Sequence, residues 1–448
     1  MYFVYTFLLT AGIVIALPYW IAQMIAHGKY RRGIGERWGA VPARLAAQQD
    51  RPTVWVHAVS VGEVLAVSSV IDELKKSNDR LRIVISTTTD TGQNLACDRF
   101  GPESVFYFPL DFPFAIRPCL QLLKPELVVL AETEFWPNFL RMAKASGARV
   151  AVVNARISRK SLRGYSLFQP FLRYVLKNID LFLAQSEEDA HRLKQIGALP
   201  ERVQVRGNLK YDVTAIKELK LTAELRISLS RTDASPVIVC GSTVDGEEPI
   251  LIEAFEFLLK HYPSAVMLIA PRHPERFAEV TSLVQQSHLP FDLRSQWTGQ
   301  QLAGHILVID SIGELSSLYS LADIAFVGGS LVPRGGHNIL EPAQHGVPIL
   351  VGPHTDNFRE MVHLFRSRDA LRVVDAEDLG NVLVELCSNP TERALLGRRA
   401  AETLRSQSGV TDRTLTALLS LLSKETLDRG TLLSENGAEP VTLSARHN

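Results

Sequence analysis

Two glutamates stand directly after predicted buried strands in the first half of the chain. Glu63 closes the sequence HAVSVGE, and Glu132 lies in AETEFWPN, with Glu134 two residues further on. A carboxylate within hydrogen-bond reach of a substrate hydroxyl can act as a general base. A structural role is the alternative, because Glu63 in the first turn of a helix would complement the helix dipole, and the other two could pair with arginines.

A glycine-rich segment in the second half, GGSLVPRGGHNILEPAQHGVPILVGP at 328–353, has the composition of a ligand-binding loop. Glycine lets the backbone approach a ligand closely and adopt positive φ. Asn338 is predicted to begin a helix whose N-terminus would face a phosphate, and Glu341 in its first turn could accept hydrogen bonds from a ribose diol. Arg272, in PRHPE, could pair with a phosphate through its planar guanidinium. Together they predict a site for a nucleotide monophosphate unit.

Two other interpretations of the same segment stay open. Asn338 and Glu341 have the spacing of a capping box, which stabilises a helix by about 1 kcal/mol and needs no ligand. His337, Glu341 and His345 stand at four-residue spacing, which could suggest a metal site. Pro342 and the adjacent glycines argue against the single regular helix face that such a site would need.

Short β-branched runs alternate with amphipathic stretches along most of the chain. The first series of predicted strands comprises 53–59, 81–87, 104–110, 127–132, 149–155, 181–186 and 203–208. The second series comprises 236–242, 265–271, 305–311, 323–330, 348–353 and 371–375. Strands buried on both faces and joined by helices indicate parallel sheets. The fold class is therefore α/β, with two Rossmann-like, doubly wound domains.

Doubly wound domains bind ligands at the carboxyl ends of their strands, where the glutamates and the glycine-rich segment lie. Two such sets of strand ends predict two domains that face each other across a cleft. The predicted organisation is an anchor at 1–27, an N-terminal acceptor-binding domain at 28–208, a linker at 209–235, a C-terminal nucleotide-binding domain at 236–423 and a disordered tail at 424–448.

The N-terminus predicts a membrane anchor. No charged side chain occurs before Lys29, and YFVYTFLLTAGIVIALPYWIAQMIA is almost entirely apolar. About 20 apolar residues suffice to cross a bilayer as a helix. Arg31, Arg32 and Arg37 follow, and the positive-inside rule then places the body of the protein in the cytoplasm. A single span is the first interpretation; Pro18 keeps open a monotopic helix that only dips into the membrane.

Composition excludes several other functions. Lys and Arg together number 48, equal to Asp and Glu, which argues against a nucleic-acid-binding protein. The four cysteines are scattered without metal-ligand spacing, which is typical of buried thiols in a reducing compartment. No Walker A motif occurs, and no G-x-G-x-x-G opens a helix after the first strand, so ATP hydrolysis and NAD binding lose support.

The order of the motifs resembles one family. HAVSVGE, ETEFWPN, NARIS, QSEEDAHRLKQIGA, GNLKYD, PRHPERF, GELSSLYSLADIAFVGGSLVPRGGHNILEPA and GPHTDNF are similar to motifs of the 3-deoxy-D-manno-octulosonic acid (Kdo) transferases of lipopolysaccharide assembly. The resemblance implies the GT-B fold and transfer of Kdo from CMP-Kdo to the acylated, phosphorylated glucosamine disaccharide precursor of lipid A. It also implies that the enzyme acts at the cytoplasmic face of a bacterial inner membrane.

The resemblance assigns roles to residues. Glu63 corresponds to the family's general base for an inverting transfer that releases CMP. Glu132 corresponds to a second functional glutamate, which binds the acceptor or holds the geometry of the site. The implied contacts to CMP fall on Pro271, Arg272, Ile312, Gly313, Glu314, Asn338, Ile339, Leu340 and Glu341. Ser242 and Thr243 are weaker candidates for contact with the sugar carboxylate or the phosphate.

No cofactor is expected. The chain contains no D-x-D sequence of the kind that holds a divalent cation in many transferases of nucleotide-diphosphate sugars. Arg272, the glycine-rich amides and a helix dipole would instead stabilise the charge of the leaving phosphate. Two competing functions remain: another GT-B enzyme (a UDP-sugar transferase with a lipid-linked acceptor, or a nucleotide-sugar epimerase), and a non-catalytic, membrane-anchored scaffold that binds a nucleotide sugar.

Overall fold

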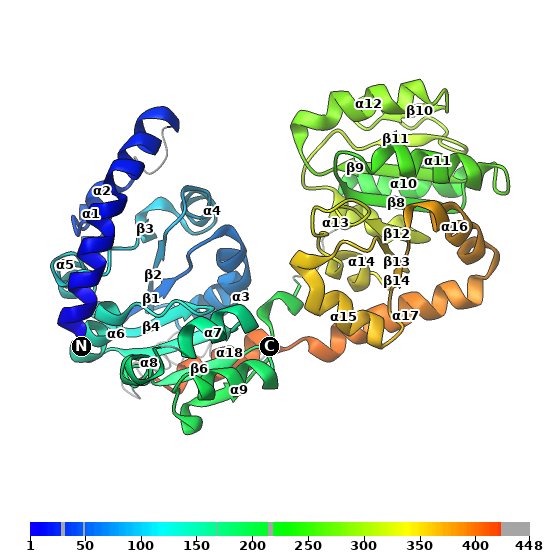
Figure 1. The fold of residues 1–448 in the computed structure, drawn as a ribbon. Coiled ribbons are helices and arrows are strands. Elements are labelled where there is room, and N and C mark those ends of the chain that lie inside the picture. The colour runs from blue at the N-terminus through cyan, green and yellow to red at the C-terminus, as the bar shows by residue number, and fades with distance from the viewer. Residues whose placement is uncertain (28–31, 48–49, 167, 214–217, 423–448) are drawn as a thin grey trace, which may run out of the picture. The chain divides into compact units, whose positions relative to one another are not determined.

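The computed structural model describes residues 1–27, 32–47, 50–166, 168–213 and 218–422 (Figure 1). The chain divides into two compact units. Unit 1 comprises Met1–Asp212 and Gly409–Asn448, and unit 2 comprises Val213–Ser408. Among the described residues, each unit is built around its own parallel sheet of seven strands with helices on both faces. The α/β class and the doubly wound architecture are confirmed.

The sheet of unit 1 has the strand order β3-β2-β1-β4-β5-β6-β7, with every pair parallel. Its strands are β1 (Thr53–His57), β2 (Arg82–Thr87), β3 (Val105–Tyr107), β4 (Pro125–Ala131), β5 (Arg149–Ala155), β6 (Leu181–Ala184) and β7 (Val203–Val205). Trp55 of β1 aligns with Val84 of β2 and Val128 of β4. The strand order reverses between β1 and β4, so the carboxyl ends of these two strands flank the usual ligand position.

Two apolar cores lie on the two faces of this sheet. One gathers Trp55 and Phe139 under α5, α6, α8 and α9; the other gathers Val56 and Ile71 under α3, α4 and α18. The helices of unit 1 after the first are α2 (Ile34–Arg37), α3 (Val61–Ser77), α4 (Asp90–Phe100), α5 (Pro113–Leu123), α6 (Pro137–Ala145), α7 (Arg159–Ser166), α8 (Gln169–Leu176), α9 (Glu187–Gln195) and α18 (Val410–Leu419).

The first helix, α1 (Tyr2–His27), packs one narrow face against unit 1. Its partly buried positions include 2, 5, 6, 9, 13 and 16, which have the spacing of a single helical stripe, whereas Ala11 is partly buried but lies off that stripe. Asn178 donates to the Tyr2 hydroxyl at 3.0 Å, and Asn138 donates to the Thr6 hydroxyl at 3.0 Å. The opposite face is exposed and apolar, with Phe3, Phe7, Leu8, Val14 and Ile15 among its side chains. By length and composition, Tyr2–Tyr19 is a candidate membrane span.

The sheet of unit 2 has the order β10-β11-β9-β8-β12-β13-β14, again with parallel pairs. Its strands are β8 (Val237–Thr243), β9 (Val266–Pro271), β10 (Phe291–Leu293), β11 (Ile306–Val308), β12 (Ile324–Val327), β13 (Ile349–Val351) and β14 (Arg372–Val373). Its helices are α10 (Lys220–Arg231), α11 (Glu248–Leu259), α12 (Phe277–Gln286), α13 (Leu315–Leu318), α14 (Leu340–Gln344), α15 (Arg359–Ser367), α16 (Leu379–Ser388) and α17 (Pro390–Gln407).

The boundaries differ from the predicted ones in two places. The segment predicted as a linker, 209–235, contains α10, whose Leu225 and Leu229 belong to the core of unit 2. The segment 409–422, predicted within the second domain, returns to unit 1, where Val410 and Leu418 join the core under α3. Both differences have one cause: apolar contacts, not sequence order, decide which unit a helix joins.

The two crossings of the chain between the units are tied together by Asp212. Its carboxylate accepts the backbone N–H of Gly409 at 2.7 Å and also that of Thr411, at the start of α18. Strand β10 has no counterpart among the predicted segments, because its three half-buried residues lie between polar stretches. The predicted disordered tail lies outside the described residues.

Candidate active site

Glu63 stands in the first turn of α3, directly after the loop that leaves β1. Its Oε2 accepts the backbone N–H of Val59 at 2.8 Å, and its Oε1 accepts the hydroxyl of Ser60 at 3.0 Å. An ionised carboxylate has about four acceptor positions, so lone pairs remain for a substrate hydroxyl. Burial, together with the charges of Glu132 and Glu134, raises the pKa of Glu63 to about 7. A base with a pKa near neutrality suits proton transfer at cellular pH.

Glu132 follows β4 on the other side of the switch point. Its φ of 56° lies in the left-handed region, which is unusual for a residue with a side chain, and its backbone N–H donates to the Val153 carbonyl at 2.9 Å. Strain of this kind persists where surrounding contacts impose it. Its carboxylate lies 3.7 Å from the ammonium of Lys210, not beside an arginine as the structural alternative supposed.

Lys210 was missed by the sequence reasoning, although its motif GNLKYD was noted. It lies in the short 3-10 helix η4 (Leu209–Tyr211), whose flanking Leu209 and Tyr211 are buried. Asn208 caps this turn by accepting the backbone N–H of Lys210 at 3.0 Å. The buried neighbours hold the backbone while the lysine between them reaches Glu132. The detectable signal was a lysine between two apolar residues immediately after a capping asparagine.

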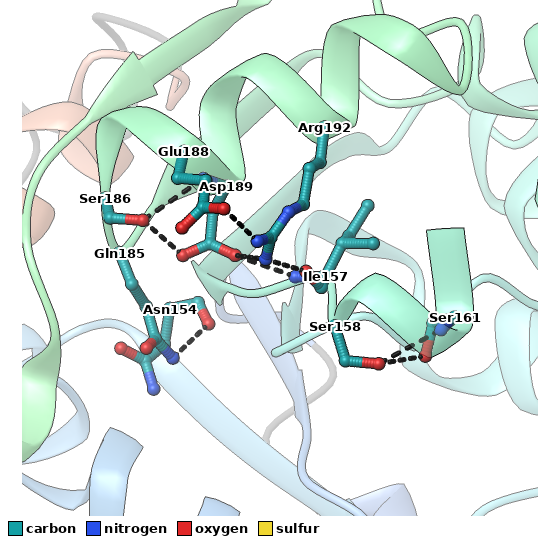
Figure 2. A network of polar contacts seen from close by, with 9 residues as sticks. All are labelled: Asn154, Ile157, Ser158, Ser161, Gln185, Ser186, Glu188, Asp189 and Arg192. Carbon is teal, nitrogen blue, oxygen red and sulfur yellow. Dashed lines mark hydrogen bonds and ion pairs between the residues drawn. The ribbon is translucent and has the colours of Figure 1, made fainter. Parts of the chain in front are cut away.

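Figure 2 shows the polar contacts that link residues of the NARIS and QSEED motifs. Asp189, buried, accepts the backbone N–H of Ile157 at 2.9 Å and the hydroxyl of Ser186 at 2.6 Å. Arg192 donates to the Ile157 carbonyl at 2.6 Å, and Gln185 donates to the Asn154 carbonyl at 2.9 Å. These contacts join the ends of β5 and β6.

The side chain of Asn154 connects this network to the turn that contains Lys210. Its Oδ1 accepts the backbone N–H of Leu209 at 3.0 Å, and its own φ of 54° is left-handed. The two motifs therefore act as a brace for the turn that presents Lys210. Glu134 completes the group, and burial raises its pKa as well. Unit 1 thus brings together three carboxylates and one lysine at the switch point between β1 and β4.

In unit 2, the predicted nucleotide residues lie at the ends of β9, β11 and β12. Arg272 is exposed directly after β9, where its backbone N–H donates to the Thr243 carbonyl at 2.9 Å. Glu341 lies in the first turn of α14; burial raises its pKa, while hydrogen bonding to Asn338 and the charge of Arg272 oppose the rise. The predicted capping box is not formed, because α14 begins at Leu340 and its N-cap, Ile339, makes no side-chain cap hydrogen bond. Asn338 instead accepts the Leu340 N–H at 3.1 Å and donates its side-chain N–H to Glu341 at 3.2 Å.

The remaining predicted CMP contacts differ in which of their polar groups a ligand could reach. Ile339 and Leu340 are fully buried, so only their backbone groups could reach a ligand. The Glu314 carboxylate is held by Arg294, at 2.5 and 2.8 Å, and by the Ser311 hydroxyl. Ile312 is exposed, and Gly313 has a φ of 90°. The stretch 312–314 therefore presents backbone groups, whereas its carboxylate is already engaged.

Ser242 and Thr243 differ from each other. Ser242 is half-buried with a left-handed φ of 56°, whereas Thr243 is completely buried and its hydroxyl does not face solvent. Pro271 is buried at the end of β9. Burial and the charges of Arg272 and His273 lower the pKa of His337 to about 4. His345 contacts the Ser316 carbonyl at 2.9 Å, and the described residues contain no group of three metal-ligating side chains.

The glycines of 328–353 have a structural explanation that the sequence reasoning missed. A Cβ on Gly328 would lie 2.5 Å from the Ser242 carbonyl oxygen and 2.8 Å from the Glu247 carboxylate. Glu247 is completely buried and accepts the backbone N–H groups of Val244, Gly329, Ser330 and Leu331 at 2.7–3.1 Å. Gly328 therefore makes room for a buried carboxylate of the protein itself, and nucleotide binding by the rest of the segment stays a prediction.

Comparison with known proteins decides the family. Residues 32–213 match the family model of the 3-deoxy-D-manno-octulosonic-acid transferases (kdotransferases). The Kdo transferase of Haemophilus influenzae is 34% identical over 88% of this chain and 93% of its own length. That of Bordetella pertussis is 36% identical over 89% of this chain and 94% of its own length. The chain belongs to the Kdo transferase family.

The fold of this Kdo transferase is also found in solved structures of distant sequence. UDP-GlcNAc 2-epimerase from Neisseria meningitidis, bound to UDP-GlcNAc, is 16% identical with a TM-score of 0.52, covering 82% of this chain and all of that one. This likeness confirms the GT-B class alone. The chain is an enzyme of this family, so the non-catalytic scaffold loses its support, while the role of Glu63 as its base stays a prediction.

Proposed function

We propose that this chain transfers Kdo from CMP-Kdo to the acylated, phosphorylated glucosamine disaccharide precursor of lipid A. The observation that carries the proposal is Glu63, a half-buried carboxylate at the switch point of unit 1 with free lone pairs and a pKa of about 7. Membership of the chain in the Kdo transferase family indicates the donor sugar, and the geometry around Glu63 indicates the base.

The transfer is a direct displacement. Glu63 takes the proton of the acceptor hydroxyl while that oxygen bonds to the anomeric carbon of Kdo, on the face opposite the phosphate. The bond from this carbon to the phosphate oxygen breaks, and its electron pair leaves with CMP, so the configuration inverts. Glu132 and Lys210 form an ion pair near Glu63, and this pair positions the acceptor.

The nucleotide is held by unit 2. The exposed Arg272 pairs with the phosphate, Glu341 and Asn338 bind the ribose, and backbone groups of 312–314 read the base. The phosphate of a monoester leaving group needs charge stabilisation more than protonation. Arg272 and the backbone amides supply it without a divalent cation, so activity is expected to persist in EDTA.

The membrane is the proposed location of the acceptor, and α1 contacts it through its exposed apolar face. The stripe from Tyr2 to Ala16 packs against the rest of unit 1, which leaves residues 17–27. At 1.5 Å per residue these extend about 17 Å, less than the roughly 30 Å of hydrocarbon that a span must cross. The contacts therefore favour the monotopic arrangement over a single span, with the catalytic body on the cytoplasmic side of a bacterial inner membrane.

The test is mass spectrometry of the product formed by the purified chain from CMP-Kdo and the phosphorylated glycolipid. The expected result is a mass gain of one or more Kdo residues together with release of CMP. A panel of UDP-sugars is the control for other GT-B activities, and none should be consumed. Consumption of a UDP-sugar, or binding of CMP-Kdo without release of CMP, would overturn the proposal.

A further inference from the structure

The phenol of Tyr319 extends to the carboxyl ends of the strands in unit 2. Tyr319 begins the short 3-10 helix η6 (Tyr319–Leu321), directly after α13, and the residue is only 1% exposed. Gly241, near the end of β8, makes room for it. A Cβ on Gly241 would collide with the Tyr319 hydroxyl oxygen and would lie 2.8 Å from Cζ of the same ring. The glycine therefore allows the hydroxyl to lie against the last part of β8.

This end of β8 is the switch point of unit 2. In the sheet, β8 lies between β9 and β12, and Gly241 aligns with Ala270 of β9 and with Val327 of β12. The chain continues from β8 to β9 on one side and returns to β12 on the other, so the strand order reverses here. A doubly wound domain binds its ligand outside the carboxyl ends of the strands at such a point. The Tyr319 hydroxyl therefore lies where the nucleotide of unit 2 is expected.

Tyr319 also lies among the segments that were predicted to contact CMP. Helix α13, which precedes it, begins directly after 312–314, and the first turn of α14 contains Glu341. His345, the C-cap of α14, contacts the Ser316 carbonyl of α13 at 2.9 Å, so the two helices are joined. Burial, and to a smaller extent the charge of Glu341, raises the pKa of Tyr319. The phenol is therefore protonated at neutral pH and can donate a hydrogen bond near Glu341.

The Tyr319 hydroxyl lacks a partner among the described residues. It makes no hydrogen bond there, and it is not one of the polar atoms that are fully enclosed. The Thr243 hydroxyl is the contrast, because it also lacks a partner but is enclosed, so no ligand can reach it. The hydroxyl of a deeply buried tyrosine normally has a hydrogen-bond partner. An accessible hydroxyl without one indicates that its partner is a ligand.

The chemistry of a ribose identifies the group that this hydroxyl would bind. Each hydroxyl of the ribose diol donates one hydrogen and can also accept. The ionised carboxylate of Glu341 can only accept, and Asn338 already donates one side-chain N–H to it at 3.2 Å. The ribose oxygens therefore need a donor, and the phenol near Glu341 supplies one.

We propose that Tyr319 is a further nucleotide-binding residue, which donates its hydroxyl to a ribose oxygen of the CMP unit while Glu341 accepts from the same diol. The inference rests on the proposed function, since it takes the nucleotide from there. It adds a residue outside 271–272, 312–314 and 338–341, and it gives Gly241 a reason to lack a side chain.

The experiment measures the binding of CMP and of 2′,3′-dideoxy-CMP to the full chain by calorimetry. Wild type should bind CMP at least tenfold more tightly than the dideoxy analogue, because the contacts to the diol are lost. Tyr319→Phe, which removes only the hydroxyl, should bind CMP roughly three- to tenfold more weakly than the wild type does. Both proteins should bind the dideoxy analogue equally, because it has no diol for the hydroxyl to bind.

Tyr262→Phe is the matched control, because Tyr262 precedes β9 and so lies at the amino ends of the strands. It should bind both nucleotides as the wild type does. An equal loss of affinity for both nucleotides in Tyr319→Phe would show that the hydroxyl only supports the fold, and would overturn the proposal. Unchanged binding of CMP by Tyr319→Phe would overturn it as well.

Steady-state kinetics provide a second measurement. In Tyr319→Phe the KM for CMP-Kdo should rise roughly three- to tenfold, while kcat and the acceptor KM change less than twofold. A fall in kcat without a change in the donor KM would contradict a contact to the ribose. Failure of the wild type to transfer Kdo would contradict the proposed function, whereas the comparison of the two nucleotides would still decide the role of Tyr319. Absence of CMP binding by the wild type would overturn both.

Discussion

Glu63 and Glu247 occupy corresponding places in the two units. Each follows the first strand of its sheet, β1 or β8, and ends a V-G-E or V-x-G-E sequence (SVGE and TVDGE). Each also accepts backbone N–H groups near the start of a helix. The two carboxylates differ in how many acceptor positions remain unoccupied. Glu247 is completely buried and four N–H groups occupy its oxygens, whereas Glu63 is half-buried and accepts one N–H and one hydroxyl.

This comparison separates a structural carboxylate from a chemical one. Burial raises the pKa of both. Only Glu63 has unused acceptor positions that a substrate hydroxyl can reach, and only Glu63 has two further glutamates near enough to raise its pKa. A perturbed pKa alone would not have distinguished them, so hydrogen-bond saturation is the better criterion for a base.

The largest expected effect is the loss of the base. Glu63→Gln keeps the shape of the side chain and should lower kcat by at least ~10², because amide oxygen cannot accept the proton. Binding of CMP-Kdo, measured by calorimetry, should be unchanged. Glu73→Gln, further along α3, is the control and should retain full activity. Normal turnover by Glu63→Gln would mean that another group is the base.

The converse change in unit 2 should affect stability. Glu247→Gln replaces one acceptor oxygen by an NH₂ group that faces backbone N–H donors, which should cost roughly 2–4 kcal/mol of unfolding free energy. Urea unfolding of the full chain measures this, with the exposed Glu253→Gln on α11 as the control. If Glu247→Gln were as stable as the wild type, the buried carboxylate would not be holding the 328–331 turn.

Sequence patterns could predict the sheets and the position of Glu63 at a strand end for a physical reason. An apolar run such as TVWVH is a local signal for a strand that is buried on both faces of a sheet. The carboxyl ends of the strands in a doubly wound sheet lie at one edge, whatever the sequences of the loops. Glu63 was therefore identifiable from its place after β1. The spacing of Asn338 and Glu341 predicted that the two side chains meet, which they do, but not as a capping box, because Ile339 is the N-cap of α14.

What escaped prediction depends on contacts between residues far apart in the chain. The pairing of Lys210 with Glu132 is accompanied by a left-handed backbone at Glu132 and by the hydrogen bond that the Leu209 N–H donates to the Asn154 side chain. The purpose of Gly328 depends on a carboxylate that lies about eighty residues earlier. The return of α18 to unit 1 is set by apolar packing under α3. No local spacing rule reports any of these.

A moderate effect is expected from the nucleotide residues of unit 2. Glu341→Ala should raise the KM for CMP-Kdo by roughly tenfold, because two hydrogen bonds to a ribose diol are lost, while kcat changes little. Initial rates at varied CMP-Kdo measure this. Glu377→Ala, an exposed carboxylate elsewhere in unit 2, is the control. Unchanged donor kinetics in Glu341→Ala would leave Glu341 only its hydrogen bond with the Asn338 side chain.

The smallest effect concerns pH and sharpens the contrast between the two glutamates. Because Glu63 must be ionised to act, kcat/KM should fall about tenfold per pH unit below its pKa of about 7 and level off above it.

The free energy of unfolding should depend on pH in the opposite direction. A carboxyl whose pKa is raised on folding, here from 4.5, binds more protons when folded, so its contribution to stability is lost as pH rises from 4.5 to 7. Glu63→Gln carries no charge to desolvate and should therefore be more stable than the wild type at pH 8, and indistinguishable from it at pH 4. Thermal unfolding at the two pH values measures the difference. A variant that is less stable at pH 8 would show that the ionised carboxylate supports the fold, as Glu247 does, and would place Glu63 among the structural residues.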